Sequence, residues 1–159
     1  MKKEKTNAMR MLDRAKVNYE FFTYDASDGH IDGASVARKM GQDPKKVYKT
    51  LVTQGHSGEH FVFVIPVEEE LDLKKAAKAV GEKNVEMIAV ADLLKTTGYI
   101  RGGCSPIGMK KPFKTVVDDS ALALDKIYVS GGRIGLQILL SPADLQKTVG
   151  AEFEQIIHN

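Results

Sequence analysis

Apolar side chains recur at the three- and four-residue spacing of an α-helix in several segments of the chain. In the first of these segments, Met9 and Leu12 fall on one helical face. Asp72 and Ser141 stand before two later segments and can cap the helices that follow them. The pattern predicts helices over residues 6–16, 34–40, 72–80, 91–96 and 141–149.

Other segments are rich in aromatic and β-branched residues and are bounded by polar or glycine-rich turns, which is the pattern of strands. The predicted strands cover residues 19–24, 47–53, 60–67, 85–88, 114–117, 127–129 and 136–140. A turn at 54–59 predicts that the strands beside it form an antiparallel hairpin. The strands at 114–117 and 127–129 likewise lie around a turn at 118–120.

The order of these elements predicts a mixed α/β fold. The strands are short and numerous, and the helices lie among them without strict strand–helix–strand alternation. This arrangement favours a mixed, partly antiparallel sheet or open barrel with flanking helices over a doubly wound parallel sheet. No repeat or linker divides the 159 residues, so we expect a single domain over residues 1–159.

Composition is that of a folded globular protein, with 43% hydrophobic and 28% charged residues. Cys104 is the single cysteine, so an intramolecular disulfide is impossible and nothing favours secretion. The charged N-terminal segment lacks the apolar run of a signal peptide, and no stretch approaches the ~20 apolar residues of a membrane span. We therefore expect a cytoplasmic protein with no membrane contact.

The net charge of +2 is too small to indicate a nucleic-acid-binding protein by itself. Basic residues nevertheless gather in three clusters. The clusters are Lys2, Lys3, Lys5, Arg10, Arg14 and Lys16, then Lys45, Lys46 and Lys49, then Lys110, Lys111 and Lys114. Each one alone is more typical of a solvated surface, and only their convergence in space would form a binding surface for a nucleic acid.

Metal-binding patterns are absent from the sequence. The four histidines, His30, His56, His60 and His158, show no HxH, HExxH or Cys/His spacing. We therefore expect neither a metal site nor a cofactor.

Cys104 lies in a glycine-rich loop, where backbone N–H groups could stabilise a nucleophilic thiolate. The alternative is that a lone cysteine is a small buried apolar residue, which is its more frequent role. No histidine is close in sequence to act as its base. The structural role is therefore favoured.

Two glycine-rich loops, at residues 102–108 and 130–135, are candidates for ligand binding. Neither fits the dinucleotide fingerprint or the Walker A motif. Because glycine has no Cβ, the main chain of such loops can approach a ligand and direct N–H groups at its oxygen atoms. Ordinary turns explain one such loop, whereas two loops flanked by strands favour a pocket lined by backbone.

Lys49 lies inside a predicted strand. Strand alternation places Lys49 on one face with Val47 and Leu51, and Tyr48 and Thr50 on the other. A lysine among apolar residues either extends past a sheet edge to water or enters a cavity, and the pattern alone favours the first. In a cavity its ammonium would be a fixed cation for a phosphate or a developing oxyanion.

Together these segments resemble the YbaK/EbsC family, the bacterial Cys-tRNA(Pro) deacylases related to the editing domain of bacterial prolyl-tRNA synthetases. The matching segments occur in the family's order along nearly the whole chain, which is more specific than any one motif. They are Thr23-Tyr24-Asp25, Tyr48-Lys49-Thr50-Leu51, residues 72–78, Thr97-Gly98-Tyr99, and residues 102–108, 128–132 and 150–153. Three positions depart from the family pattern: Cys104 replaces an aliphatic residue, Met109 a glutamine and Asn7 a proline.

The resemblance implies the editing-domain fold, a mostly antiparallel sheet curled into a partial barrel with flanking helices. It implies that Lys49 is the catalytic residue. It also implies an aminoacyl-adenosine pocket lined by Tyr24, Ile31, Thr50, Gly102, Gly103, Ser105, Pro106, Gly108, Ser130, Gly131 and Gly132.

The implied activity is trans-editing, the removal of cysteine from mischarged tRNA(Pro). The acceptor end of an aminoacyl-tRNA would be the substrate and prolyl-tRNA synthetase a partner, with no DNA and no cofactor. The cysteinyl thiol would attack its own ester carbonyl, so that positioning replaces an enzyme nucleophile. Two alternatives stay open: a deacylase that uses water on another substrate such as Ala-tRNA(Pro), and a module that binds aminoacyl-tRNA or a synthetase without turnover.

Overall fold

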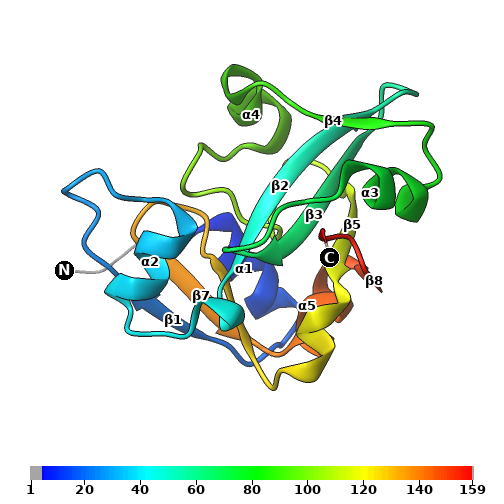
Figure 1. Cartoon of the computed structure of the whole chain (residues 1–159). Coiled ribbons are helices and arrows are strands. Elements are labelled where there is room, and N and C mark those ends of the chain that lie inside the picture. The colour runs from blue at the N-terminus through cyan, green and yellow to red at the C-terminus, as the bar shows by residue number, and fades with distance from the viewer. Residues whose placement is uncertain (1–4, 159) are drawn as a thin grey trace.

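Two β-sheets and five α-helices form the part of the chain that the computed structural model describes, residues 5–158 (Figure 1). The larger sheet has the strand order β4 (Val85–Met87), β2 (Tyr48–Gly55), β3 (His60–Pro66), β5 (Lys114–Asp118) and β8 (Glu152–Glu154). The smaller sheet has the order β1 (Glu20–Thr23), β7 (Leu136–Leu140) and β6 (Ile127–Ser130). Lys2 and Lys3 of the first basic cluster lie outside the described residues.

The helices are α1 (Asn7–Arg14), α2 (Gly33–Lys39), α3 (Leu73–Val80), α4 (Val90–Thr97) and α5 (Pro142–Val149). The predicted caps are present, because the Asp72 side chain accepts hydrogen bonds from the first turn of α3 and Ser141 from that of α5. All five predicted helices are thus confirmed, with ends shifted by at most two residues. Within residues 5–158, no helix is long and apolar enough to cross a membrane.

The predicted hairpin of β2 and β3 lies at the centre of the larger sheet and is confirmed. The two strands pair antiparallel, with Lys49 opposite Ile65 and Thr50 opposite Val64. Every residue of β3 after His60 is buried. This double-sided burial explains why the segment has the most continuous apolar run of the chain.

The turn predicted at residues 118–120 does not connect paired strands. A 3-10 helix, η2 (Asp119–Ala123), follows β5 and carries the chain to the other sheet, where β6 pairs with β7. β5 instead pairs in parallel with β3, and β8 pairs in parallel with β5. These parallel pairs join segments far apart in the sequence, so no local turn signal predicts them.

The partial barrel implied by the sequence resemblance was wrong. The two sheets are separate, and among residues 5–158 an isolated parallel bridge between Val47 and Tyr128 is the one ladder contact between them. A barrel needs hydrogen-bonded strands all the way round. The predicted mixed α/β class is confirmed. The pairing is mostly antiparallel as predicted, since four of the six strand pairs are antiparallel.

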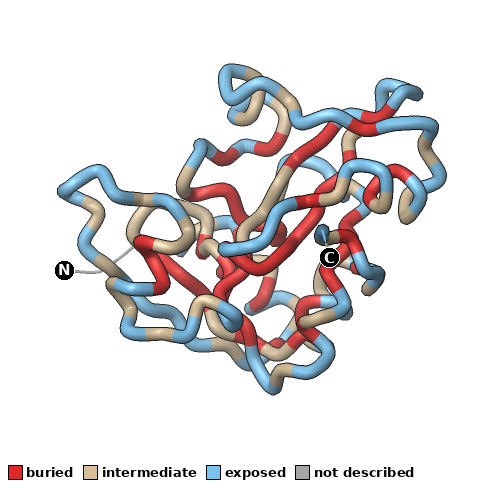
Figure 2. The backbone as a smooth tube through the Cα atoms, in the orientation of Figure 1, coloured by how far each residue is buried: buried red, intermediate tan, exposed pale blue. Residues whose placement is uncertain are grey.

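Buried residues follow the strands of the larger sheet (Figure 2). Apolar side chains pack against both faces of this sheet. Val62 and Val64 pack in the main cluster, which also contains α1 and the inner face of the smaller sheet, including Ile138. Phe63 and Ile65 point the other way, into the cluster that includes Ala76 of α3. Thr50, opposite Val64, therefore lies on the side of the smaller sheet, where the candidate site is found.

Candidate active site

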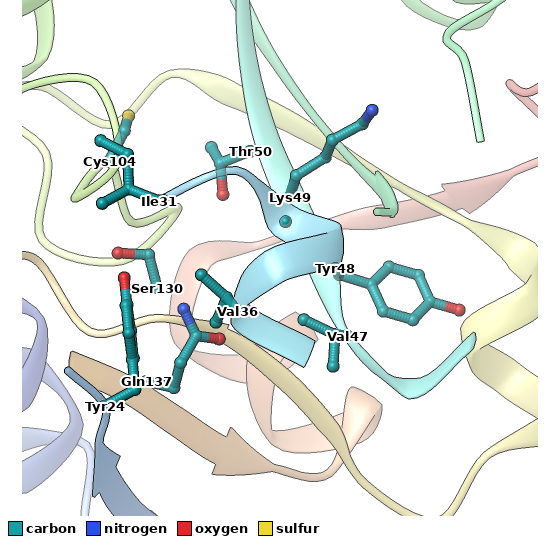
Figure 3. Close-up of a pocket in the computed structure, with 12 residues that line it drawn as sticks. Tyr24, Ile31, Val36, Val47, Tyr48, Lys49, Thr50, Cys104, Ser130 and Gln137 are labelled. Atoms are coloured by element: carbon teal, nitrogen blue, oxygen red, sulfur yellow. The ribbon is translucent and has the colours of Figure 1, made fainter. Parts of the chain in front are cut away.

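A pocket of about 150 Å³ lies where the beginning of β2 meets α2 and the smaller sheet (Figure 3). Six separate segments contribute to it: the residue after β1, α2 with the loop before it, the start of β2, the glycine loop after α4, the strand β6 and the strand β7. Its lining consists of Tyr24, Ile31, Gly33, Val36, Val47, Tyr48, Lys49, Thr50, Gly102, Cys104, Ser130 and Gln137.

One wall of this pocket is apolar. Ile31, Val36 and Val47 line it, and both valines are at most 3% exposed. Of the aspartates, glutamates and histidines in residues 5–158, none lines the pocket. A small apolar or thiol-bearing side chain would fit this wall, whereas a group that needs a carboxylate or imidazole partner would find none.

Three buried oxygen atoms of the lining have no hydrogen-bond partner: the hydroxyl oxygens of Tyr24 and Thr50 and Oε1 of Gln137. They are the unpartnered buried side-chain polar atoms found in residues 5–158, and all three border this one pocket. A buried polar group without a partner costs about 1–3 kcal/mol. Such groups in a native protein call for an explanation, and a bound ligand supplies one.

Lys49 borders the pocket but does not point into it. Its position opposite Ile65 places it on the other face of β2 from Thr50, as alternation predicted. Figure 3 shows the Lys49 ammonium directed away from Tyr24 and Ser130. No hydrogen bond or ion pair with any residue in the range 5–158 holds it there, so the flexible side chain is free to reorient.

The two glycine-rich loops pack against each other. A Cβ on Gly103 would lie 2.8 Å from Cα of Arg133, in the second loop. Gly102 has a φ of +86°, and a Cβ there would lie 2.6 Å from Cδ1 of Ile31. These glycines are therefore required for close approach of one main chain to another and to the pocket wall.

The structure brings together only part of the expected pocket lining. Lys49, Tyr24, Ile31, Thr50, Gly102 and Ser130 border the pocket. Gly103, Ser105, Gly131 and Gly132 lie in the supporting loops and are not part of its lining. Pro106 and Gly108 instead line a separate groove with Met11 and Phe113.

Cys104 is part of the pocket wall and only 9% exposed. Burial raises the pKa of its thiol to about 11, although a hydrogen bond with Thr97 partly offsets this. Because the thiolate is the nucleophilic form, the thiol is almost wholly unreactive at neutral pH. This environment favours the structural role over the nucleophilic one.

Gln137, Val36 and Val47 line the pocket but were not among the expected site residues. The valines are indistinguishable in sequence from core residues. Gln137, however, is the one polar residue in the run Leu136–Leu140, and it is only 6% exposed. A polar residue within an apolar strand is the signal that could have identified it.

Across residues 5–158, no group of three or more histidine, cysteine, aspartate or glutamate side chains is arranged to hold a metal ion.

Comparison with protein families identifies the family to which the chain belongs. The sequence model of the aminoacyl-tRNA editing domain matches residues 32–148, which include α2, the β2–β3 hairpin and both glycine loops. The chain belongs to the aminoacyl-tRNA editing domain family. The family relationship predicted from the ordered sequence segments is therefore confirmed, and with it an aminoacyl-tRNA substrate.

Among curated proteins, the chain is similar to EbsC of Enterococcus faecalis, whose name gives it an inferred Cys-tRNA(Pro)/Cys-tRNA(Cys) deacylase activity. The two are 47% identical over 153 residues, which cover 96% of this chain and 93% of the relative. A proline–tRNA ligase of Thermosipho melanesiensis is 26% identical over 97 residues, a match that covers 17% of that longer protein.

Among solved structures, the chain is similar to one described as a trans-editing enzyme for prolyl-tRNA synthetase. The TM-score is 0.83 and the sequence identity 21%, and the match covers 99% of this chain and all of the other. At this identity the likeness concerns the fold.

Proposed function

We propose that this protein is a trans-editing deacylase that removes cysteine from mischarged tRNA(Pro). The observation that carries the proposal is the 47% identity to Enterococcus faecalis EbsC over nearly the full length of both chains. The pocket supports it, because an apolar wall for a small side chain faces polar atoms that lack partners. Editing would take place in the cytoplasm, where tRNA is charged.

Cleavage would use the thiol of the substrate. Its sulfur forms a bond with the ester carbonyl carbon, the bond from that carbon to the ribose oxygen breaks, and the thiol proton ends on the released tRNA hydroxyl. Cysteine leaves as a cyclic thiolactone. Two features support this route. The Cys104 thiol has a pKa of about 11, and the pocket lining, as far as residues 5–158 form it, has no histidine or carboxylate to activate Ser130 or water.

Lys49 is the proposed catalytic cation. It borders the pocket and has no partner among residues 5–158, so rotation of its side chain would carry the ammonium over the pocket mouth. There it would attract the terminal phosphate and stabilise negative charge on the ester carbonyl. Thr50, the next residue, would meet the substrate from the opposite face of the strand.

The direct test is incubation of the protein with Cys-tRNA(Pro) and measurement of the remaining ester. We expect rapid loss of the ester, and a loss of rate of about 100-fold in Lys49→Ala, the effect typical of removing one group that stabilises an oxyanion. Lys78→Ala, a charge removal at an exposed position of α3, is the matched control and should retain the rate. An ester that stays intact with the unaltered protein would refute the proposal.

The chemical route is tested by the substrate. A tRNA carrying S-methylcysteine has no free thiol and should resist cleavage, whereas a mechanism that uses water would still cleave it. Faster cleavage of Ala-tRNA(Pro) than of Cys-tRNA(Pro) would instead favour the alternative specificity. Binding of either tRNA without any turnover would indicate the non-catalytic module.

Prolyl-tRNA synthetase is the proposed partner. The similarity to a segment of a proline–tRNA ligase supports a shared substrate, since that enzyme charges the same tRNA. If the two proteins cooperate, adding the synthetase should lower the KM of the deacylase for Cys-tRNA(Pro). An unchanged KM would argue that this protein acts alone.

A further inference from the structure

Gln137 occupies a buried position where an apolar side chain would give a more stable free protein. It lies in β7 between Leu136 and Ile138, pairs with Phe22 on one side and Ser130 on the other, and is only 6% exposed. Its Oε1 is buried and accepts no hydrogen bond. Figure 3 shows the carboxamide extending into the pocket beside Tyr24 and Val36.

An unpartnered buried oxygen destabilises the free protein, because the atom has lost its water and gained no donor. An apolar side chain of the same size would avoid this cost. The oxygen of a carboxamide can only accept hydrogen bonds, so its missing partner must be a donor. Among residues 5–158, Lys49 is the one lysine or arginine of the lining, and its ammonium points away. The hydroxyl groups of Tyr24, Thr50 and Ser130 could also donate, but no hydrogen bond joins any of them to Gln137. This leaves a group of the ligand as the donor.

On the proposed function, the group that enters this pocket is an aminoacyl ester. Its side chain suits the apolar wall of Ile31, Val36 and Val47. Its α-amino group carries several N–H donors and has no carboxylate partner in the lining. The hydroxyl groups of Tyr24 and Thr50 are two further unpartnered oxygens that can accept from the same group.

We propose that Gln137 is a specificity-determining residue that accepts a hydrogen bond from the α-amino group of the aminoacyl ester. Gln137 then selects aminoacyl groups with a free amine over those that lack it, such as hydroxyacyl or N-blocked groups. The proposal rests on the proposed function for the identity of the ester. It depends on binding, however, and not on which nucleophile cleaves the ester.

The test compares two stable ligands by calorimetry: adenosine with cysteine joined to its 3′ position by an amide, and the same compound without the α-amine. The protein should bind the first about 3- to 10-fold more tightly, the value of one neutral hydrogen bond. Gln137→Met, which is similar in size but apolar, should bind both equally. Gln137→Asn, which withdraws the carboxamide by one carbon, should also lose the preference. Gln146→Met on the exposed face of α5 should keep it.

A second readout separates recognition from a structural role. If the role of Gln137 is to bind the ligand and not to stabilise the fold, Gln137→Met should have the same Tm as the unaltered protein or a higher one. Three results would each overturn the proposal. Gln137→Met could still prefer the amine-bearing compound, it could bind both compounds more weakly by the same factor, or the unaltered protein could fail to bind the amine-bearing compound. Discrimination that depends on Gln137 in a protein that leaves Cys-tRNA(Pro) intact would refute the deacylase function and support the role of Gln137.

Discussion

Burial decides what the thiol of Cys104 can do. In the folded protein the thiol pKa rises from its ordinary 9.0 to about 11, chiefly because burial penalises the thiolate. The thiol ionises at a lower pH in the unfolded chain than in the folded protein. The contribution of its un-ionised form to the free energy of unfolding is therefore fully present below pH 9 and is lost as the pH rises to about 11. The size of the effect is about 2–3 kcal/mol.

Cys104→Ala should remove this pH dependence. We expect urea unfolding to show that the free energy of unfolding falls less steeply between pH 9 and pH 11 in the variant than in the unaltered protein. Burial, and to a lesser extent the charge of the Cys104 thiolate, raise the pKa of Tyr99 to about 12. Tyr99 is present in both proteins, so the part of its effect that comes from burial cancels in the comparison. Equal slopes in the two proteins would mean that the thiol is not buried as described.

Two threonines of β2 make a matched pair that tests the unpartnered oxygens. The Thr53 hydroxyl donates to the carbonyl oxygen of Phe61 at 3.1 Å, whereas that of Thr50 has no partner. Thr53→Val should therefore lower the free energy of unfolding by about 1 kcal/mol, and Thr50→Val should leave it unchanged or raise it. Thr50→Val should nevertheless slow deacylation. Equal destabilisation of the two variants would show that Thr50 has a partner in the free protein.

At the scale of elements, the two glycine loops are brought together by main-chain contact. Gly103 packs on the backbone of Arg133 and Ile134, and the three nearest atoms of that turn lie within 3 Å of a Cβ placed on Gly103. Backbone cannot move aside as a side-chain end can. The pocket wall formed by Gly102 and Cys104 depends on this contact.

Gly103→Ala should lower the free energy of unfolding by about 1–3 kcal/mol through overpacking, as measured by urea denaturation. Gly55→Ala is the comparison, because the three atoms nearest a Cβ there belong to the side chain of Glu82. That side chain accepts two hydrogen bonds from Ser57 but can move more readily than backbone. Both glycines have a φ that other residues can adopt, so the comparison isolates contact from backbone strain. A larger loss in Gly55→Ala would contradict this account.

At the scale of the whole molecule, we expect any attraction for a nucleic acid to be local rather than due to overall charge. The net charge is only +2, but Lys45 and Lys46 in η1 (Pro44–Lys46) directly precede Val47, which lines the pocket. Lys74 and Lys78 lie on α3, which covers the opposite face of the larger sheet (Figure 1). On the proposed function, the η1 lysines lie near the acceptor end of the bound tRNA.

The double variant Lys45→Ala/Lys46→Ala should weaken tRNA deacylation at low salt and reduce the dependence of log kcat/KM on log salt concentration. The expected reduction in slope is up to about 1 per lysine that contacts a phosphate. Lys74→Ala/Lys78→Ala removes the same charge on α3 and should leave the slope unchanged. The same slope change in both double variants would mean that overall charge, and not the η1 position, attracts the tRNA.

The sequence by itself determined the features that depend on neighbouring residues. Helix positions followed from apolar spacing and from the capping side chains Asp72 and Ser141, and the β2–β3 hairpin from two strands beside a short turn. Alternation along β2 correctly separated Lys49 from Thr50. The ordered motifs also identified the family, because they reflect many local requirements at once.

Only the tertiary structure decided which distant segments meet. The parallel pairing of β5 with β3 involves strands some fifty residues apart and has no local signal. The separation of the strands into two sheets, which excludes a barrel, likewise depends on distant segments. The pocket combines six such segments. The sequence could mark Gln137 as an unusual polar residue and could favour an outward Lys49, but only the fold placed both residues at this pocket. The physical reason is that these contacts depend on how whole sheets pack, and packing is set by the sum of many weak interactions between residues far apart in the chain.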